Sequence, residues 1–91
     1  MPETKKSIFT KKYNLFRDLI ISARKEAALS QVDLAKKLKR PQSFVSKYER
    51  GERRLDLVEF LEIAKAIGID PIDLIKKLER AFHGQNNNCR P

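Results

Sequence analysis

Apolar residues recur along this chain at intervals of three and four positions, the spacing that gathers them on one face of a helix. No stretch alternates between apolar and polar residues over more than four positions, so the pattern predicts no β-sheet. Prolines and glycines separate the periodic segments. We expect five helices, spanning Thr10–Ala28, Gln31–Leu38, Gln42–Arg50, Leu57–Ile67 and Pro71 to about Phe82.

Residues that favour helix ends stand at the borders of these segments. Serine and aspartate accept hydrogen bonds from the free N–H groups of a first turn, proline fits the first helical position, and glycine suits the residue after a last turn. Asp56 and Glu59 have the spacing of a capping box. The other signals are Ser30, Pro41, Gly51, Gly68, Asp70 and Pro71.

The helical stripes also predict the core and the domain boundaries. The residues expected to face inward are Tyr13, Leu15, Phe16, Leu19, Ile20, Ala23 and Ala27, then Val32, Leu34, Ala35 and Leu38, then Leu57, Phe60, Leu61, Ala64 and Ile67, and finally Leu74, Ile75 and Leu78. The fold class is therefore all-α, a compact five-helix bundle in one domain over residues 10–83. A flexible basic N-terminus at 1–9 and a disordered tail at 84–91 are expected to flank it.

The charge is high for so short a chain. Twenty Lys and Arg against twelve Asp and Glu give 91 residues a formal net charge of +8. Eight bases and two acids fall within residues 36–54, whereas residues 55–80 hold four bases and six acids. This excess favours a polyanionic partner, most often nucleic acid and less often an anionic membrane surface. Taken alone, the charges fit a solvated surface equally well.

The composition also argues against several classes of function. No apolar run approaches the roughly 18–20 residues of a membrane span, and residues 1–6 lack the apolar stretch of a signal peptide, so we expect a cytoplasmic protein. Cys89 is the single cysteine and His83 the single histidine. They leave no partners for a disulfide framework, a catalytic triad or a zinc site. We expect no enzyme, no metal and no cofactor.

Residues 31–51 have the plan of a helix-turn-helix, two short helices joined by a three-residue break. Two helices cross closely only where a side chain is small, and Ala35 supplies that residue. Val45, midway along the second helix, is expected to lock it onto the first. The crossing is then sealed by Leu34, Leu38 and Tyr48.

With these residues the chain resembles the Cro/C1-type (XRE-like) helix-turn-helix family of prokaryotic and phage repressors. The resemblance extends from Ile20 to Leu78. It is carried by Leu29-Ser30-Gln31, Leu34-Ala35, Gln42-Ser43, Val45-Ser46-Lys47 and Glu49-Arg50-Gly51. It implies a lambda-repressor-like bundle whose recognition helix, residues 42–50, enters the major groove of double-stranded DNA.

The resemblance further implies that the first turns of the recognition helix read base edges. Glutamine pairs bidentately with adenine, and lysine reaches guanine. The candidate base-reading residues are Gln42, Ser43 and Lys47, with Phe44 and Ser46 beside them. Two alternatives stay open, because Phe44 also fits as a core residue and Ser46 as a solvent-facing spacer.

A second set of residues is expected to hold the DNA backbone, which fixes register without reading sequence. These residues are Ser30, Gln31, Arg50, Arg53 and Arg54. The first two open a helix, where free N–H groups favour a phosphate. In the family this glutamine also supports the residue that matches Gln42. For one of the three arginines, pairing with Glu49 or Glu52 is the alternative.

The resemblance also implies a partly buried ion pair between Arg24 and Glu49 that ties the first helix to the recognition helix. Three residues depart from the family pattern. Ala28 and Lys39 stand where glycine is usual, at turn positions that often need a positive φ. Arg40 stands where an apolar residue is usual. These departures leave the geometry of the turns open.

Together these features predict a sequence-specific DNA-binding transcriptional regulator and favour a repressor. One recognition helix reads too few base pairs to be selective in a genome, so we expect a homodimer on a palindromic operator. The candidate dimer surface comprises Ile69, Ile72, Ile75 and Phe82, which alternatively close the core of the monomer. The alternative function is an antitoxin-type protein that binds a protein partner through residues 1–17 or 84–91 and regulates its own operon.

Overall fold

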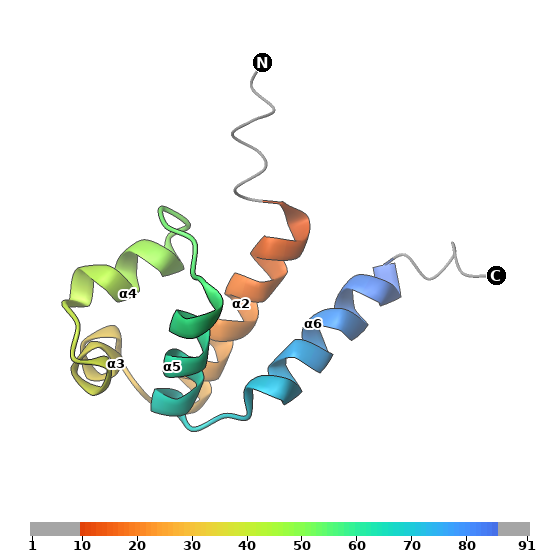
Figure 1. Cartoon of the computed structure of the whole chain (residues 1–91). Coiled ribbons are helices and arrows are strands. Elements are labelled where there is room, and N and C mark those ends of the chain that lie inside the picture. Colours follow the sequence, from red (N-terminus) through yellow and green to blue (C-terminus); the bar gives the residue numbers. More distant parts are fainter. Residues whose placement is uncertain (1–9, 86–91) are drawn as a thin grey trace, which may run out of the picture.

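The computed structural model describes residues 10–85, and in this range the chain forms five helices and no strand. Numbered as in Figure 1, they are α2 (Lys11–Glu26), α3 (Gln31–Leu38), α4 (Gln42–Glu49), α5 (Leu57–Ile67) and α6 (Pro71–Gln85). The predicted all-α class is confirmed. Most helix ends lie within two residues of their expected positions.

The last helix runs further than the sequence indicated. We expected it to end near Phe82, with a tail from residue 84, but α6 continues through Gly84 to Gln85. A single glycine costs a helix about 1 kcal/mol and does not force it to stop. The rest of the predicted tail, residues 86–91, and the predicted N-terminal segment, residues 1–9, lie outside the described residues.

Side chains cap the first turns of α2, α3 and α5 but not that of α4. Thr10 caps α2, and complete capping boxes open α3 and α5, formed by Ser30 with Asp33 and by Asp56 with Glu59. α4 follows Pro41, whose side chain cannot accept a hydrogen bond. The first N–H groups of α4 are therefore left without a side-chain partner.

Schellman motifs end α2, α3 and α4, and a related left-handed motif ends α5, where the N–H groups of Gly68 and Ile69 both donate to the Ala64 carbonyl. The left-handed residue of each motif is Ala28 (φ 61°), Lys39 (φ 59°), Gly51 (φ 83°) or Gly68 (φ 94°). In the turn after α3, for example, the Arg40 N–H donates to the Ala35 carbonyl at 3.0 Å. The two non-glycine residues thus keep the positive φ that the family pattern implied, at a strain of roughly 1 kcal/mol each.

The core lies where α2, α3, α4 and α5 meet, and α6 packs along α2 (Figure 1). Its largest fully buried side chains are Tyr48, Ile20, Leu34, Ile63 and Val45. Ala35 is 3% exposed at the crossing of α3 with α4, so the small residue lies where the helix-turn-helix pattern requires it. This crossing fixes the direction in which α4 points.

The predicted inward face of α5 is partly wrong. Leu57 and Leu61 are 66% and 43% exposed, whereas Ile63, which was not predicted, is 1% exposed. Phe60, Ala64 and Ile67 are buried as expected. Because α5 is apolar at most positions, more than one stripe fits its periodicity. Packing against α3 and α6 decides which stripe is buried.

Three further residues predicted to face inward lie at the surface. Ala27 is exposed just after α2, Val32 is 42% exposed in the first turn of α3, and Ile75 is 40% exposed on α6. Each belongs to the margin of its stripe, and a helix that packs on one side only leaves such a margin in solvent. Leu74, beside Ile75, is buried as predicted.

Candidate nucleic-acid interface

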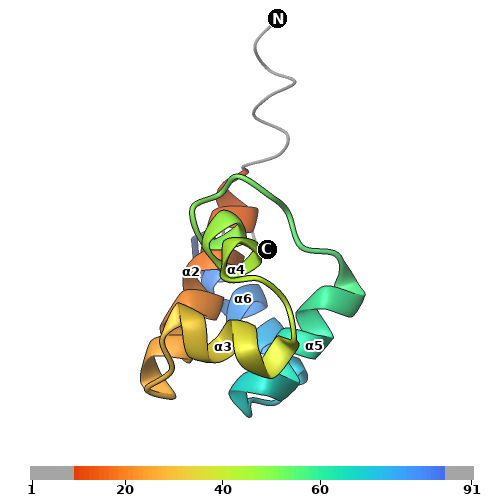
Figure 2. The same ribbon diagram turned by 90° about the vertical axis from the view of Figure 1, so that its left-hand side faces the viewer.

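α3 and α4 lie together on the face that is turned toward the viewer in Figure 2. α4 buries Val45 and Tyr48, which are 0% and 1% exposed, against the core. The Ser46 hydroxyl donates to the Ser43 carbonyl at 3.3 Å, and the residue is half-buried. The polar residues exposed on the outer side of α4 are Gln42, Ser43 and Lys47.

Hydrogen bonds connect the interior of the domain to the first residue of α4. Nε and Nη2 of Arg24 donate to Oε2 and Oε1 of Glu49 at 2.7 and 3.0 Å. These side chains are only 10% and 6% exposed, and the carboxylate raises the pKa of Arg24. Nε2 of Gln31 donates to the same Glu49 Oε1 at 3.0 Å. Nε2 of Gln42 in turn donates to Oε1 of Gln31 at 3.4 Å.

These four residues, Arg24, Glu49, Gln31 and Gln42, form a continuous series that we call the amide relay. It joins α2, α3 and both ends of α4. Arg24 also donates from Nη1 to the Leu29 carbonyl at 2.8 Å, so its guanidinium is held both by α4 and by the turn between α2 and α3. The ion pair implied by the resemblance thus begins a longer series of hydrogen bonds, which ends at the candidate base-reading residue Gln42.

The start of α3, a candidate phosphate site, is already capped from within. The Ser30 hydroxyl accepts the Asp33 N–H at 2.9 Å, and the Ser30 N–H donates to the Asp33 carboxylate at 3.0 Å. The hydrogen bond from the Ser30 backbone N–H, supported by the Ser30 hydroxyl, lowers the pKa of the Asp33 carboxyl group. A phosphate that approached Ser30 would compete with this carboxylate, so the first turn is better suited to contact through Gln31.

The three arginines after α4 have different surroundings. Nε and Nη2 of Arg50 each donate to the Glu52 carboxylate at 3.0 Å, which is the pairing alternative foreseen for one of them. Both side chains of this pair are more than half exposed. The Arg54 guanidinium lies 4.5 Å from the centre of the Tyr13 ring, whose hydroxyl accepts the Leu55 N–H at 3.1 Å.

Arg53, which we expected to hold a phosphate, is instead bound to Glu59 although its side chain is 38% exposed. Its Nη1 and Nη2 donate to Oε1 and Oε2 of Glu59 at 2.9 and 2.7 Å, and Nη1 also donates to the Arg54 carbonyl at 3.0 Å. A bidentate pair of this kind occupies the fork that a phosphate needs. The phosphate role assigned to Arg53 is therefore not carried further.

Phe44 belongs with the core margin rather than with the base-reading side of α4. Its ring packs edge-to-face against Tyr48 at a centroid distance of 5.4 Å. The guanidinium groups of Arg40 and Arg53 lie over it, 4.5 and 4.9 Å from its centre. Among the two readings of Phe44 that the sequence left open, these contacts favour the core.

Arg40, Phe44, Arg53 and Glu59 form a group that we call the Phe44 cluster, and sequence reasoning missed it. Glu59 lies within 3.8 Å of Arg40 as well as binding Arg53, and hydrogen bonding by Arg53 lowers its pKa to about 2. Arg40 also pairs with Glu62 at 3.3 Å. One sequence signal could have indicated this cluster: Arg40 stands at a position that is usually apolar and lies four residues before Phe44, over which it stacks.

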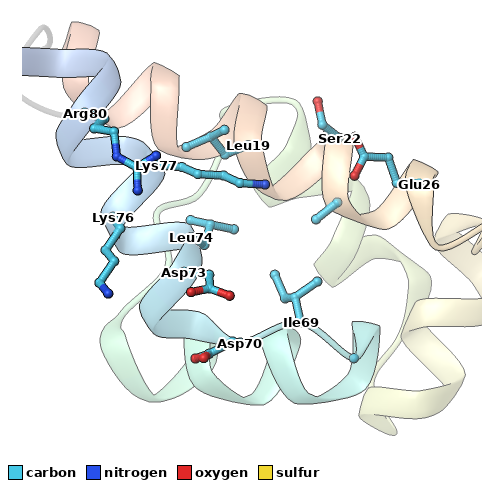
Figure 3. A pocket seen from close by; sticks show the side chains of 12 residues that line it. Leu19, Ser22, Glu26, Ile69, Asp70, Asp73, Leu74, Lys76, Lys77 and Arg80 are labelled. Carbon is cyan, nitrogen blue, oxygen red and sulfur yellow. The ribbon is translucent and has the colours of Figure 1, made fainter. Parts of the chain in front are cut away.

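A groove of about 460 Å³ separates α2 from the first half of α6, away from α4 (Figure 3). Leu19, Ile69 and Leu74 form its apolar floor. Figure 3 shows the Lys77 side chain extending from α6 toward α2, with Asp73 about one turn earlier on the same helix. Three acidic side chains, Glu26, Asp70 and Asp73, balance three basic ones, Lys76, Lys77 and Arg80, in its lining, so the groove does not continue the basic surface of the helix-turn-helix.

The described residues offer neither a metal site nor a membrane-spanning helix. No group of three or more His, Cys, Asp and Glu among them could hold a metal ion. None of the helices in residues 10–85 combines the length and apolar character needed to cross a bilayer.

The fold and the exposed side of α4 define a helix-turn-helix DNA-binding domain, and comparison with known proteins agrees. A family model described as helix-turn-helix matches residues 20–74. The solved structure of an XRE-family like protein from Pseudomonas syringae pv. tomato str. DC3000 matches with a TM-score of 0.77 and 47% sequence identity. The match covers 85% of this chain and 96% of that one. No curated protein matches the chain.

The chain belongs to the Cro/C1-type (XRE-like) helix-turn-helix family and is a DNA-binding transcriptional regulator.

Proposed function

We propose that this regulator is a repressor that binds a palindromic operator as a homodimer. Each protomer inserts α4 into the major groove of double-stranded DNA, with Gln42, Ser43 and Lys47 facing base edges. Gln31, Arg50 and Arg54 contact phosphates on either side and fix the register. Arg50 exchanges its exposed partner Glu52 for a phosphate on binding.

The observation that carries this proposal is the division of α4 into two sides. Val45 and Tyr48 are fully buried, whereas Gln42, Ser43 and Lys47 are exposed on the same two turns of helix. A helix about 10 Å across fits the major groove, and amide and ammonium groups at these positions offer the hydrogen bonds that base edges accept or donate.

Apolar residues exposed on α6 support the dimer. Ile72 and Ile75 are 55% and 40% exposed, whereas Ile69 is half-buried and packs against the core. Ile69 therefore fits the alternative in which it closes the monomer, and the Phe82 side chain lies outside the described ones. A homodimer that packs through these isoleucines about a two-fold axis requires a DNA site with two-fold symmetry.

Selection of bound duplexes from a random DNA pool tests this function. We expect a palindromic site with half-sites about 10 bp apart, or a multiple of this, and an affinity roughly 10³-fold or more above that for random DNA. Ile72→Glu combined with Ile75→Glu should convert the site to a single half-site. Recovery of no consensus sequence would contradict the proposal.

Two variants separate base reading from phosphate contact. Gln42→Ala should weaken binding about 5- to 150-fold at one base pair only, because it removes a base contact from an exposed position. Arg54→Ala should weaken binding to all sequences alike and reduce the salt dependence of binding. Equal losses on operator and random DNA for Gln42→Ala would remove Gln42 from the base-reading set.

A further inference from the structure

Glu49 does not contact Gln42, yet the amide relay determines which way the Gln42 amide points. Glu49 is paired with Arg24 at 2.7 Å, and its side chain is 6% exposed. An ionised carboxylate accepts hydrogen bonds and donates none. The Gln31 amide must therefore turn its NH2 group toward Glu49, and its Nε2 does donate to Oε1 there at 3.0 Å.

The same logic passes from Gln31 to Gln42. With Nε2 directed at Glu49, Gln31 presents its Oε1 to Gln42, and an amide oxygen only accepts. The Gln42 amide must turn its NH2 group toward this oxygen, as the 3.4 Å contact shows. One N–H and the Oε1 of Gln42 are then left for a partner outside the protein.

A remaining donor beside a remaining acceptor matches one purine better than the other. In the major groove adenine offers the N7 acceptor beside the N6 donor, whereas guanine offers two acceptors, N7 and O6. The Gln42 amide reaches adenine with both groups satisfied. To satisfy guanine it would need both N–H groups, one of which is engaged by Gln31.

We propose that Glu49 is a specificity-determining positioning residue: through Gln31 it fixes the Gln42 amide in the orientation that fits adenine rather than guanine. This inference rests on the proposed base-reading role of Gln42. Glu49 itself touches no base.

The test first finds the base pair that Gln42 contacts and then compares two purines at that position. Pool selection with wild type and Gln42→Ala identifies the position whose preference is lost. Dissociation constants are then measured for duplexes with adenine or guanine there. Wild type should favour adenine about 10-fold or more. The ratio within one variant cancels general changes in charge and stability.

Two substitutions of Gln31 change the polarity of the relay without touching Glu49 or Gln42. Gln31→Leu removes the link, so the adenine preference should fall to about 3-fold or less. Gln31→Lys keeps a donor toward Glu49 but also presents a donor, not an acceptor, to Gln42. The Gln42 amide should then turn round and offer two N–H groups, so the preference should reverse toward guanine. A purely structural role for Gln31 does not produce such a reversal.

A matched pair of variants separates the relay from the ion pair. Arg24→Gln and Glu49→Gln both break the ion pair, but only Glu49→Gln replaces the acceptor-only group with an amide that can donate or accept. We expect Arg24→Gln to keep the adenine preference and Glu49→Gln to lose it, with folding of each checked by circular dichroism. The Gln31 variants decide the matter if either of these does not fold.

The outcomes are distinguishable. If Gln42→Ala loses no base position, the base-reading role fails and the inference fails with it. If Gln42 reads a base but the adenine preference persists in both Gln31→Leu and Gln31→Lys, only the inference is overturned. A wild-type preference for guanine at that position also overturns it.

Discussion

The C-terminal end of α4 is tied into the domain, whereas its N-terminal end is left open. Glu49 is held by Arg24 and Gln31 in a nearly buried setting, and Gly51 closes the helix with a Schellman motif. At the other end Pro41 supplies no cap, and Gln42 is exposed, with one long hydrogen bond of 3.4 Å to Gln31. Gln42 thus keeps hydrogen-bonding groups available at the end of α4 where DNA is expected to bind.

This difference shows how one short helix serves the fold and the partner at once. A helix of eight residues is not stable by itself in water, so its position must come from tertiary contacts. The anchored C-terminal end of α4 sets the orientation of the helix, and its uncapped first turn keeps polar groups available for a ligand. Substitutions that break the contacts of Glu49 should lower the free energy of unfolding. Substitutions in the first turn of α4 should lower only the affinity for DNA.

The largest expected effect comes from breaking the fixed end. Arg24→Met should lower the free energy of unfolding by about 3–5 kcal/mol, because it leaves the Glu49 carboxylate buried without its cation. Urea denaturation followed by circular dichroism measures this loss. The double variant Arg24→Met/Glu49→Leu should recover most of it, since no charge is then stranded. An unchanged urea midpoint for Arg24→Met would refute the anchoring role.

The variant Glu59→Gln tests whether the Phe44 cluster, like the pair of Arg24 and Glu49, stabilises the position of α4. At neutral pH we expect a loss of about 1–3 kcal/mol in unfolding free energy, since the variant weakens the bidentate bond to Arg53. The pKa of Glu59 is lowered to about 2 in the folded protein. Its contribution should therefore be complete above about pH 5 and disappear as the pH falls toward 2.

The comparison for Glu59 is made by measuring both proteins across this pH range. The difference in unfolding free energy between wild type and Glu59→Gln should shrink as the pH is lowered from 5 to about 2. A difference that stays constant with pH would show that the ion pair does not stabilise the fold.

Tyr48→Phe should strengthen the fixed side of α4. The Tyr48 hydroxyl is buried and has no hydrogen-bond partner among the described residues, and burial raises its pKa. Removing a buried and unsatisfied hydroxyl should raise the free energy of unfolding by about 0.5–1.5 kcal/mol. Thermal denaturation of the variant measures the change. A loss of stability instead would mean that the hydroxyl has a partner in solution.

The smallest effects are expected at the turns in which a residue has a positive φ. Lys39→Gly and Ala28→Gly should each stabilise the protein by about 0.5–1 kcal/mol, because glycine adopts a positive φ without strain. Gly68→Ala is the matched reverse test: no atom lies within 4 Å of the added Cβ, so its expected loss of about 1 kcal/mol comes from the φ of 94° alone. If Lys39→Gly destabilises the domain, the turn does not need this conformation.

Local sequence signals predicted the helices and their ends because caps, proline and glycine act over a few residues. Ser30, Asp56 and Gly51 each mark the end that they occupy. Tertiary choices were harder. The buried stripe of α5 could not be predicted, since Leu61 and Ile63 are equally apolar and only the neighbouring helices distinguish them.

The candidate site shows the same limit. The exposed positions of α4 follow from the helical period once Val45 is placed inside. The pairing of Arg53 with Glu59 does not follow, because several acids lie within reach of that loop and the chain direction after Gly51 decides among them. The orientation of the Gln42 amide likewise depends on a carboxylate that is two side chains away.

Backbone amide chemical shifts, followed by NMR while the protein is titrated with its selected duplex, show whether α4 is the surface that binds DNA. The largest shifts should fall on residues 42–47 and on Gln31, whereas Glu49 should change little because the C-terminal end of α4 is already fixed. The DNA-binding role of α4 is contradicted if α4 does not respond and the largest shifts fall on α6 or on the groove between α2 and α6.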